Sequence, residues 1–189
     1  EKAHVYAYNY ALKKNCLPEW KFKDMVGLFG RPHGEVVSIL IHGRDRAIIK
    51  RIKIEHDRVL VQQFFKYSRV KKGVRRILAI LNKKYRLAIV SNASHRSIVA
   101  LLHGAGLERS FFSALIGNDD VAHSKPYPDE IFTAEKLIHA RARYIIGDSP
   151  YDIIAGKLAH VVTIGLLSGR YSKKQLESVK TDYIIKNLS

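Results

Sequence analysis

The chain has 189 residues, of which 47% are hydrophobic, and its formal net charge is +16 at pH 7. This size and apolar content suit one well-packed core, or a core with a smaller second domain, and they exclude a disordered or fibrous chain. No apolar run reaches the roughly 18 residues that a membrane span needs, so no membrane partner is expected. The single Cys16 excludes an intrachain disulfide and is typical of a reducing compartment, which predicts a cytoplasmic protein.

The basic residues are concentrated in the first half of the chain. Residues 1–90 hold 21 of the 33 Lys and Arg but 7 of the 17 Asp and Glu, and the densest stretches are Arg44–Arg58 and Lys71–Arg86. Such charge is typical either of solvated helix faces or of a surface that binds nucleic acid. Because no nucleic-acid-binding motif accompanies the charge, the sequence favours solvated helix faces.

The first 68 residues have the pattern of a helical domain. Short helices are predicted over residues 3–14, 22–29 and 32–42, the last with Pro32 in its first turn. Asp45 is the expected N-cap of a longer helix. The apolar residues of that helix recur at helical spacing, and they are Ile48, Ile52, Leu60, Phe64 and Phe65.

After Val70 the pattern changes to short apolar runs that alternate with helices. Strands are predicted over residues 86–91, 113–117, 144–148, 161–165 and 183–185. Helices are predicted over residues 72–82, 94–103, 128–139, 150–159 and 172–178. This alternation indicates βαβ units and a parallel sheet, which binds ligands at the carboxyl ends of its strands. We therefore expect a helical domain at 1–68 and an α/β domain at 69–189.

Three short segments carry candidate site residues. The first is Ser91-Asn92, where a strand ends just before a helix begins, so that hydroxyl and backbone N–H groups face one edge of the sheet and could bind phosphate. A simpler interpretation is a turn at Ser91 followed by an N-cap at Ser94. Taken alone, this segment favours the simpler interpretation.

The second segment is Ser124-Lys125-Pro126, in a loop stiffened by two prolines. A fixed ammonium at Lys125 could offset the charge on a phosphate and on a nucleophilic carboxylate. The alternative is an ordinary surface lysine. The residues alone do not decide between the two.

The third segment, Gly147–Asp152, is the most informative. A glycine and a carboxylate lie at the end of a predicted strand, and a second carboxylate lies in the first turn of the helix that follows. Asp148 could ligate a hard cation directly, while Asp152 could ligate it through water or orient Lys125. A purely structural role would have Ser149 cap the helix and Asp152 complement its dipole. A functional site is favoured, because capping does not need Asp148.

Other polar residues give weaker signals. Asp119-Asp120 follows a strand but is expected to be an acidic loop, and Cys16 has no base nearby that would make it a nucleophile. The histidines show no metal-ligand spacing and are interpreted as ordinary. They are His4, His33, His42, His56, His95, His103, His123, His139 and His160.

Taken in this order, Ser91, Lys125-Pro126 and Gly147-Asp148-x-x-x-Asp152 resemble the second, third and fourth motifs of the haloacid dehalogenase superfamily. Within it the chain is similar to the phosphoglycolate phosphatase and β-phosphoglucomutase-like group. The resemblance implies a three-layer Rossmann-like parallel sheet with an inserted helical cap, here residues 1–68.

The resemblance also implies roles for single residues. Ser91 and Asn92 would bind the phosphoryl group, Lys125 would stabilise the nucleophile, and Asp148 with Asp152 would hold Mg²⁺. The loop that ends at Arg31 matches the place where such a cap reaches its substrate, so Arg31 is a candidate substrate contact. Its alternative is a surface residue before Pro32.

The family's first motif, a strand ending in Asp-x-Asp, does not occur in these residues. In the family fold this strand is central, between the strands that carry Ser91 and Asp148. We therefore expect that about 10–20 residues with this strand precede residue 1 in the natural protein, and that residues 1–189 alone are inactive. A rival expectation is a pseudoenzyme whose gap is filled by another segment or chain.

The function implied is a Mg²⁺-dependent phosphatase of a small phosphorylated metabolite, acting through an aspartyl-phosphate. One alternative is a phosphomutase of the same superfamily, and another is a catalytically inactive module that binds nucleic acid or protein through the basic half. The sequence is compatible with a monomer or a homodimer.

Overall fold

The computed structural model describes residues 1–43, 45–167 and 170–187, and it divides into two compact units. The first unit comprises Glu1–Val70 and Arg96–Glu108, and the second comprises Lys71–His95 and Arg109–Ser189. Residues 96–108 thus group with the N-terminal helices, whereas a division at residues 68 and 69 would place them in the second unit. Arg44, which opens one of the basic stretches, lies outside the described residues.

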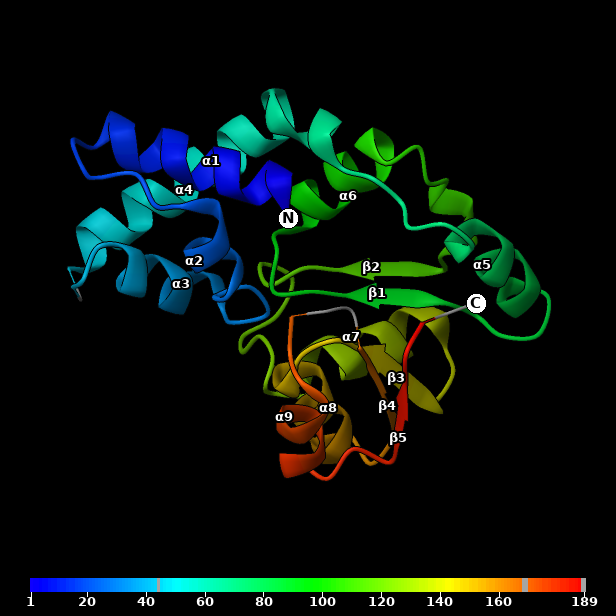
Figure 1. Cartoon of the computed structure of the whole chain (residues 1–189). Helices are drawn as coiled ribbons and strands as arrows, with labels where there is room; N and C mark the ends of the chain where they lie inside the picture. The colour runs from blue at the N-terminus through cyan, green and yellow to red at the C-terminus, as the bar shows by residue number, and fades with distance from the viewer. Residues whose placement is uncertain (44, 168–169, 188–189) are drawn as a thin grey trace. The chain divides into compact units, whose positions relative to one another are not determined.

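The first unit is helical throughout its described elements (Figure 1). These elements are α1 (Lys2–Lys14), α2 (Phe22–Val26), α3 (His33–Leu40), α4 (Arg46–Gln62), η1 (Phe64–Tyr67) and most of α6 (His95–Gly104). Asp45 caps α4 as predicted, because its Oδ1 accepts the backbone N–H groups of Ala47 at 2.8 Å and Ile48 at 3.0 Å. The prediction that α4 includes Phe64 and Phe65 is wrong: the chain leaves the α-helix at Gln63 (φ −131°) and forms the short 3₁₀ helix η1.

Apolar side chains of α1 to α4 form one large core in the first unit. It consists of Val5, Tyr8, Ala11, Leu12, Met25, Phe29, Val36, Val37, Leu40 and Ile52. Burying each large aliphatic side chain contributes about 1.5–3 kcal/mol to stability. A smaller cluster joins α1 and α4 to Leu101 of α6. The end of α6 also needs a glycine, since a Cβ at Gly104 would lie 2.0 Å from the carbonyl oxygen of Phe65.

The second unit alternates strands with helices, as the sequence predicts. Its strands are β1 (Ala88–Val90), β2 (Ala114–Ile116), β3 (Tyr144–Gly147), β4 (Val162–Leu166) and β5 (Tyr183–Ile185). Its helices are α5 (Val74–Asn82), η2 (Arg109–Phe111), α7 (Asp129–Ile138), α8 (Pro150–Leu158) and α9 (Lys173–Ser178). All strand pairs are parallel, so this is an α/β fold.

The strands form two separate sheets instead of one (Figure 1). In the part of the chain that the structure describes, β1 pairs with β2 alone, and β3 begins the order β3-β4-β5. Among the described residues, no strand pairs with the other edge of β1 or with the other edge of β3. One edge of β1 and one edge of β3 therefore lack a neighbouring strand among the described residues, and the resemblance places its central strand between these two strands.

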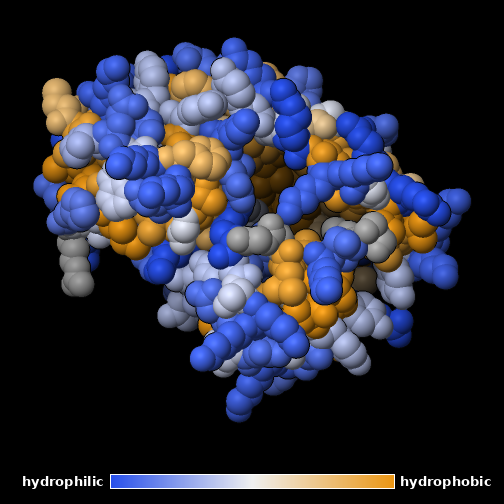
Figure 2. Space-filling model, in the orientation of Figure 1, coloured by the Kyte–Doolittle hydropathy of each residue, from blue (hydrophilic) through white to orange (hydrophobic). Residues whose placement is uncertain are grey.

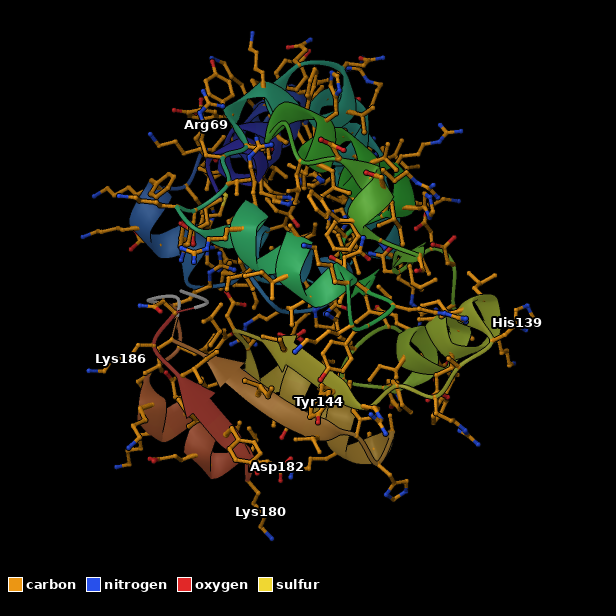
Figure 3. All side chains as sticks on the ribbon, turned by 90° about the vertical axis from the view of Figure 1, so that its right-hand side faces the viewer. Arg69, His139, Tyr144, Lys180, Asp182 and Lys186 are labelled. Atoms are coloured by element: carbon orange, nitrogen blue, oxygen red, sulfur yellow. The ribbon has the colours of Figure 1, made fainter. Side chains whose placement is uncertain are left out.

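One face of the three-stranded sheet is also uncovered. α8 packs on the face that carries Ile145, which is 7% exposed. On the opposite face Tyr144 is 50% exposed and Ile146 is 43% exposed, and Figure 2 shows hydrophobic residues at the surface over this sheet. In Figure 3, Tyr144 lies on β3 and Asp182 at the start of β5. Parallel sheets are normally covered on both faces, so this unit lacks part of its cover.

Helix α5 shows the same incomplete burial. None of its described residues is fully buried, and Ile80 is 46% exposed. None of the helices that the structure describes combines the length and the apolar character needed to cross a bilayer.

Candidate active site

Lys125 links the carboxyl ends of two strands. It precedes α7 and is 6% exposed. Its Nζ donates a hydrogen bond to the carbonyl oxygen of Val90 at 2.8 Å and another to Asp152 Oδ1 at 2.6 Å. Val90 ends β1, and Asp152 lies in the first turn of α8, directly after β3. The interpretation of Lys125 as an ordinary surface lysine is therefore wrong.

The turn after β1 is held against the same loop. Ser91 N–H donates to the carbonyl oxygen of Ile116 at 3.0 Å, which extends the pairing of β1 with β2. The Ser91 hydroxyl accepts the N–H of Ala93 at 3.2 Å, as in a simple turn. The side-chain amide of Asn92 donates to the carbonyl oxygen of Lys125 at 3.2 Å. The structure thus brings Ser91 and Asn92 together with Lys125.

The start of α8 is fixed by a capping box between Ser149 and Asp152. Asp152 Oδ2 accepts the Ser149 N–H at 3.1 Å and the Ser149 hydroxyl at 2.6 Å, while Oδ1 accepts Lys125. Both carboxylate oxygens are therefore engaged, which favours an orienting role for Asp152 over direct metal ligation. Gly147 is required here, because a Cβ at this position would lie 2.2 Å from the Cβ of Asp152.

Asp148 and Arg31 differ in how they relate to this group. Asp148 is half-buried between Gly147 and Ser149, and its charge acts on Lys125. Arg31 belongs to the first unit, where its guanidinium forms an ion pair with Glu35 of α3. A substrate contact by Arg31 therefore stays a prediction.

The buried charges stabilise one another. Burial alone lowers the pKa of Lys125, but the carboxylates of Asp152, Glu130 and Asp148 outweigh it and hold this pKa above its usual value. Burial likewise raises the pKa of Asp152, but Lys125 and Ser149 hold it below its usual value. At neutral pH the site therefore contains an ammonium and a carboxylate in direct contact.

Glu130 is the residue that the sequence analysis missed. It is fully buried in α7, and its Oε2 lies 3.9 Å from Lys125 Nζ. Burial raises its pKa to about 7, against the opposing effect of Lys125. The only sequence signal was a glutamate one residue after Asp129 in the first turn of a helix, which is equally typical of an exposed residue that complements the helix dipole.

Asp119 and Asp120 have a structural role. Asp119 Oδ1 accepts the N–H of His95 at 2.7 Å, and Asp120 Oδ2 accepts the N–H of Gly117 at 2.8 Å. These bonds fix the start of α6 and the turn after β2. The interpretation of this pair as a plain loop, and not as part of the site, agrees with these contacts.

The sequence of this chain matches a known protein family. The family model for haloacid dehalogenase-like hydrolases matches residues 1–166. The chain belongs to this family. As a member of the haloacid dehalogenase-like hydrolases, it has the α/β fold with parallel strands and flanking helices that the resemblance implied.

Its similarity to individual proteins is moderate. It is 30% identical to the pyrophosphatase PpaX of Listeria monocytogenes over 146 residues, which are 76% of this chain and 64% of that protein. It is 35% identical to a phosphoglycolate phosphatase of Colwellia psychrerythraea over 105 residues, 54% of this chain and 45% of that protein. The chain therefore spans less than two thirds of the length of these relatives.

A solved structure with the same fold is CbbY from Rhodobacter sphaeroides, determined in complex with phosphate. The TM-score is 0.82 at 18% identity, and the match covers 98% of this chain and 87% of that one. At this identity the match establishes the fold alone.

Proposed function

We propose that this haloacid dehalogenase-like hydrolase is a Mg²⁺-dependent phosphatase of a small phosphorylated metabolite, of the phosphoglycolate phosphatase type. The observation that carries the proposal is the buried Lys125 ammonium, 2.6 Å from Asp152 and 2.8 Å from the end of β1. A fixed cation at the carboxyl ends of parallel strands is suited to offset charge that develops on a phosphoryl group. The names of the two relatives, a pyrophosphatase and a phosphoglycolate phosphatase, support phosphoryl chemistry.

The phosphate would be bound by Ser91, Asn92 and Lys125. The Ser91 hydroxyl accepts the N–H of Ala93, which leaves its own proton to donate to a phosphoryl oxygen. The backbone N–H of Asn92 would supply a second donor at the end of β1. Lys125 would offset the charge on the equatorial oxygens, and Asp152 would keep its ammonium in place.

The nucleophile is proposed to come from a strand outside residues 1–189 that pairs with β1 on one side and β3 on the other. Two unpaired strand edges in the same unit support this proposal. The end of such a strand would lie near Lys125, because Lys125 bonds to the end of β1 and to the helix that follows β3. Residues 1–189 alone would then bind phosphate but would not hydrolyse a phosphorylated substrate.

In this mechanism, a carboxylate of the added strand attacks phosphorus in line and displaces the alcohol oxygen of the substrate. A second carboxyl group of that strand, in its protonated form, gives its proton to the leaving oxygen and becomes a carboxylate. It then takes a proton from the water that hydrolyses the aspartyl-phosphate. Throughout, Ser91 holds one phosphoryl oxygen and Lys125 offsets the developing negative charge.

The donor set at the end of β3 fits Mg²⁺, which prefers carboxylate and water oxygens. Asp148 would hold it, whereas both oxygens of Asp152 are already engaged, so that Asp152 would act through Lys125. When bound, the ion would add positive charge beside the phosphoryl oxygens.

The test is phosphate release by the natural gene product from a panel of phosphorylated metabolites, in Mg²⁺ and in EDTA. We expect release that EDTA abolishes, and we expect Asp148→Asn to reduce it by about 10²–10³-fold. Asp24→Asn, an exposed carboxylate of α2, is the matched control and should retain full activity. Equal activity of Asp148→Asn and Asp24→Asn would contradict the role given to Asp148.

Two other functions would release no phosphate in this assay and would need a second readout. A phosphomutase would isomerise a sugar phosphate without net release of phosphate. A catalytically inactive module would show no Mg²⁺-dependent turnover, and its binding of nucleic acid would weaken steeply with salt. Neither is favoured by a contact in the structure.

We further propose that the helical unit acts as the cap that selects the substrate, and that the protein works in the cytoplasm as a monomer or homodimer. The exposed Cys16, the single cysteine of the chain, supports the reducing compartment.

A further inference from the structure

A group of buried polar side chains lies inside the helical unit, apart from the residues of the proposed active site. His33 begins α3, while His56 and Asp57 are neighbours in the middle of α4. His33 is 6% exposed and His56 is 1% exposed. The side chain of Asp57 is 29% exposed and so reaches solvent.

The ligand atoms of these three residues are close enough to share one ion. His56 Nδ1 lies 2.8 Å from Asp57 Oδ1, and His33 Nδ1 lies 3.9 Å from the same oxygen. One ligand atom from each residue lies within 4.8 Å of the other two. Ligand atoms around a tetrahedral Zn²⁺ are about 3.3 Å apart, so small rotations of these side chains would complete the geometry.

The His33 ring packs edge-on against Tyr8 and His56, but its polar atoms have no hydrogen bond among the described contacts. Its Nε2 is buried without a hydrogen-bond partner among the described residues, and the 3.9 Å between its Nδ1 and Asp57 is too long for a hydrogen bond. Buried polar groups without partners are uncommon in native proteins and require an explanation. A metal ion bound by Nδ1 would make this buried ring a ligand, with the ring proton on Nε2.

His56 already has the outer contact that metal-binding histidines usually make. Its Nε2 lies 3.1 Å from His4 Nδ1, and the hydroxyl of Ser97 donates to Asp57 Oδ1 at 3.5 Å. On metal binding, the neutral His56 ring would change tautomer: its one proton would leave Nδ1, and Nε2 would carry a proton that it donates to His4 Nδ1. Asp57 would stay a carboxylate. Such outer contacts fix the orientation of the ligands.

We propose that His33, His56 and Asp57 form a transition-metal site of the Zn²⁺ class that links α3 to α4, with an open coordination position on the side of Asp57. Two imidazoles and one carboxylate are a donor set typical of Zn²⁺ and Co²⁺, whereas Mg²⁺ prefers oxygen alone.

The test uses the whole chain, freed of metal with a chelator and titrated with Zn²⁺ by calorimetry and with Co²⁺ by visible absorption. We expect saturable binding of one equivalent. At free Zn²⁺ a hundred times the Kd, the melting temperature should rise by about 5–10 °C. His33→Gln and Asp57→Asn should each weaken binding by at least about tenfold.

Three controls identify the site. His103→Gln removes an exposed imidazole of the same unit and Asp24→Asn an exposed carboxylate, and both should bind as the wild type does. Asp148→Asn removes the carboxylate of the proposed active site and should also leave this binding unchanged. Circular dichroism without metal verifies that each variant is folded.

Absence of saturable binding by the wild-type chain would overturn the proposal, whatever the variants do. So would unchanged affinity in folded His33→Gln and Asp57→Asn, or loss of binding in Asp148→Asn, which would assign the ion to the other unit. His56→Gln serves in place of either variant that does not fold.

Discussion

The two units bury their apolar residues very differently. In the helical unit, side chains from α1 to α4 share one large cluster, in which Leu12 and Ile52 are completely buried. In the α/β unit the two clusters of buried residues are smaller, one near β3 and one near β2, and Val90 of β1 packs against both. The first unit thus completes its core from its own residues. In the second unit, as far as the structure describes it, two strand edges are unpaired and one sheet face is uncovered.

This difference shows what holds the second unit together. Among the described residues β1 and β3 are not paired with each other, and the buried ion pair of Lys125 with Asp152 links the ends of the two sheets. In this unit, polar contacts therefore supply part of the stability that continuous apolar packing supplies in the first unit.

The largest effect on stability is expected for Lys125→Met. It leaves the Asp152 carboxylate buried without its ammonium partner, so the free energy of unfolding should fall by about 3–5 kcal/mol in urea denaturation at pH 7. Lys157→Met is the control, because it breaks an exposed pair with Asp182 and should change stability far less. Equal losses of free energy of unfolding in the two variants would mean that the ion pair of Lys125 with Asp152 does not stabilise the two sheets.

The next prediction compares the two cores directly. Leu12→Ala in the large cluster of the helical unit should lower the free energy of unfolding by about 2–5 kcal/mol, because it leaves a cavity among buried neighbours. Ile80→Ala on α5, where the side chain is 46% exposed, should cost less than about 1 kcal/mol. Urea denaturation of both variants under the same conditions measures the two losses in free energy of unfolding. Similar losses would contradict the difference in burial between the two units.

Glu130 gives the second unit a dependence on pH. The pKa of this carboxyl is about 7 in the fold and lies near 4.5 in the unfolded chain, so the native state binds a proton that the unfolded state releases between these values. Its contribution to stability is present below about pH 4.5 and is lost as the pH rises through 7, by about 3 kcal/mol in total.

The backbone N–H of Lys125 donates to Glu130 Oε1 at 3.4 Å, and in Glu130→Gln, which cannot ionise, the amide oxygen can still accept it. Its free energy of unfolding should therefore fall less between pH 5 and pH 8 than that of the wild type, and at pH 8 it should be the more stable protein. Glu19→Gln, at an exposed site, should follow the wild-type curve. Parallel curves for Glu130→Gln and wild type would show that Glu130 does not titrate in this range.

The smallest effect concerns the turn before α8. Gly147→Ala should cost about 1–3 kcal/mol, because the new Cβ would lie 2.2 Å from the Cβ of Asp152 and would disturb the capping box. Gly34→Ala in α3 is the matched control: it meets nothing within 4 Å and should be neutral or slightly stabilising. A neutral Gly147→Ala would mean that the turn can shift without loss.

Much of the fold was predictable because local signals are strong in this chain. The strands from Ala88 to Ile185 lie within one or two residues of the apolar runs, since buried parallel strands need continuous apolar segments. Asp45 and Ser149 mark helix starts through hydrogen bonds to residues close in sequence. The contact of Lys125 with Asp152 was one of two alternatives given for Asp152, and the structure contains it.

What the sequence could not predict depends on contacts between distant segments. Glu130 has the same local pattern as an exposed first-turn acid, and only the packing of α7 buries it. His33 and His56 lie on different helices, so their spacing in the chain gives no metal signature, although the fold brings them together with Asp57. The grouping of α6 with the N-terminal helices likewise depends on Leu101 and Gly104 packing against α4 and η1.

The central claim is that a strand outside residues 1–189 pairs with β1 and β3. Amide hydrogen exchange of the segments Ala88–Val90 and Tyr144–Gly147, compared between residues 1–189 and the natural gene product, tests it most directly. The account predicts that both segments exchange faster in residues 1–189 and become strongly protected in the natural product. Equal exchange in the two proteins, or a natural product with the same 21.5 kDa mass, would contradict it.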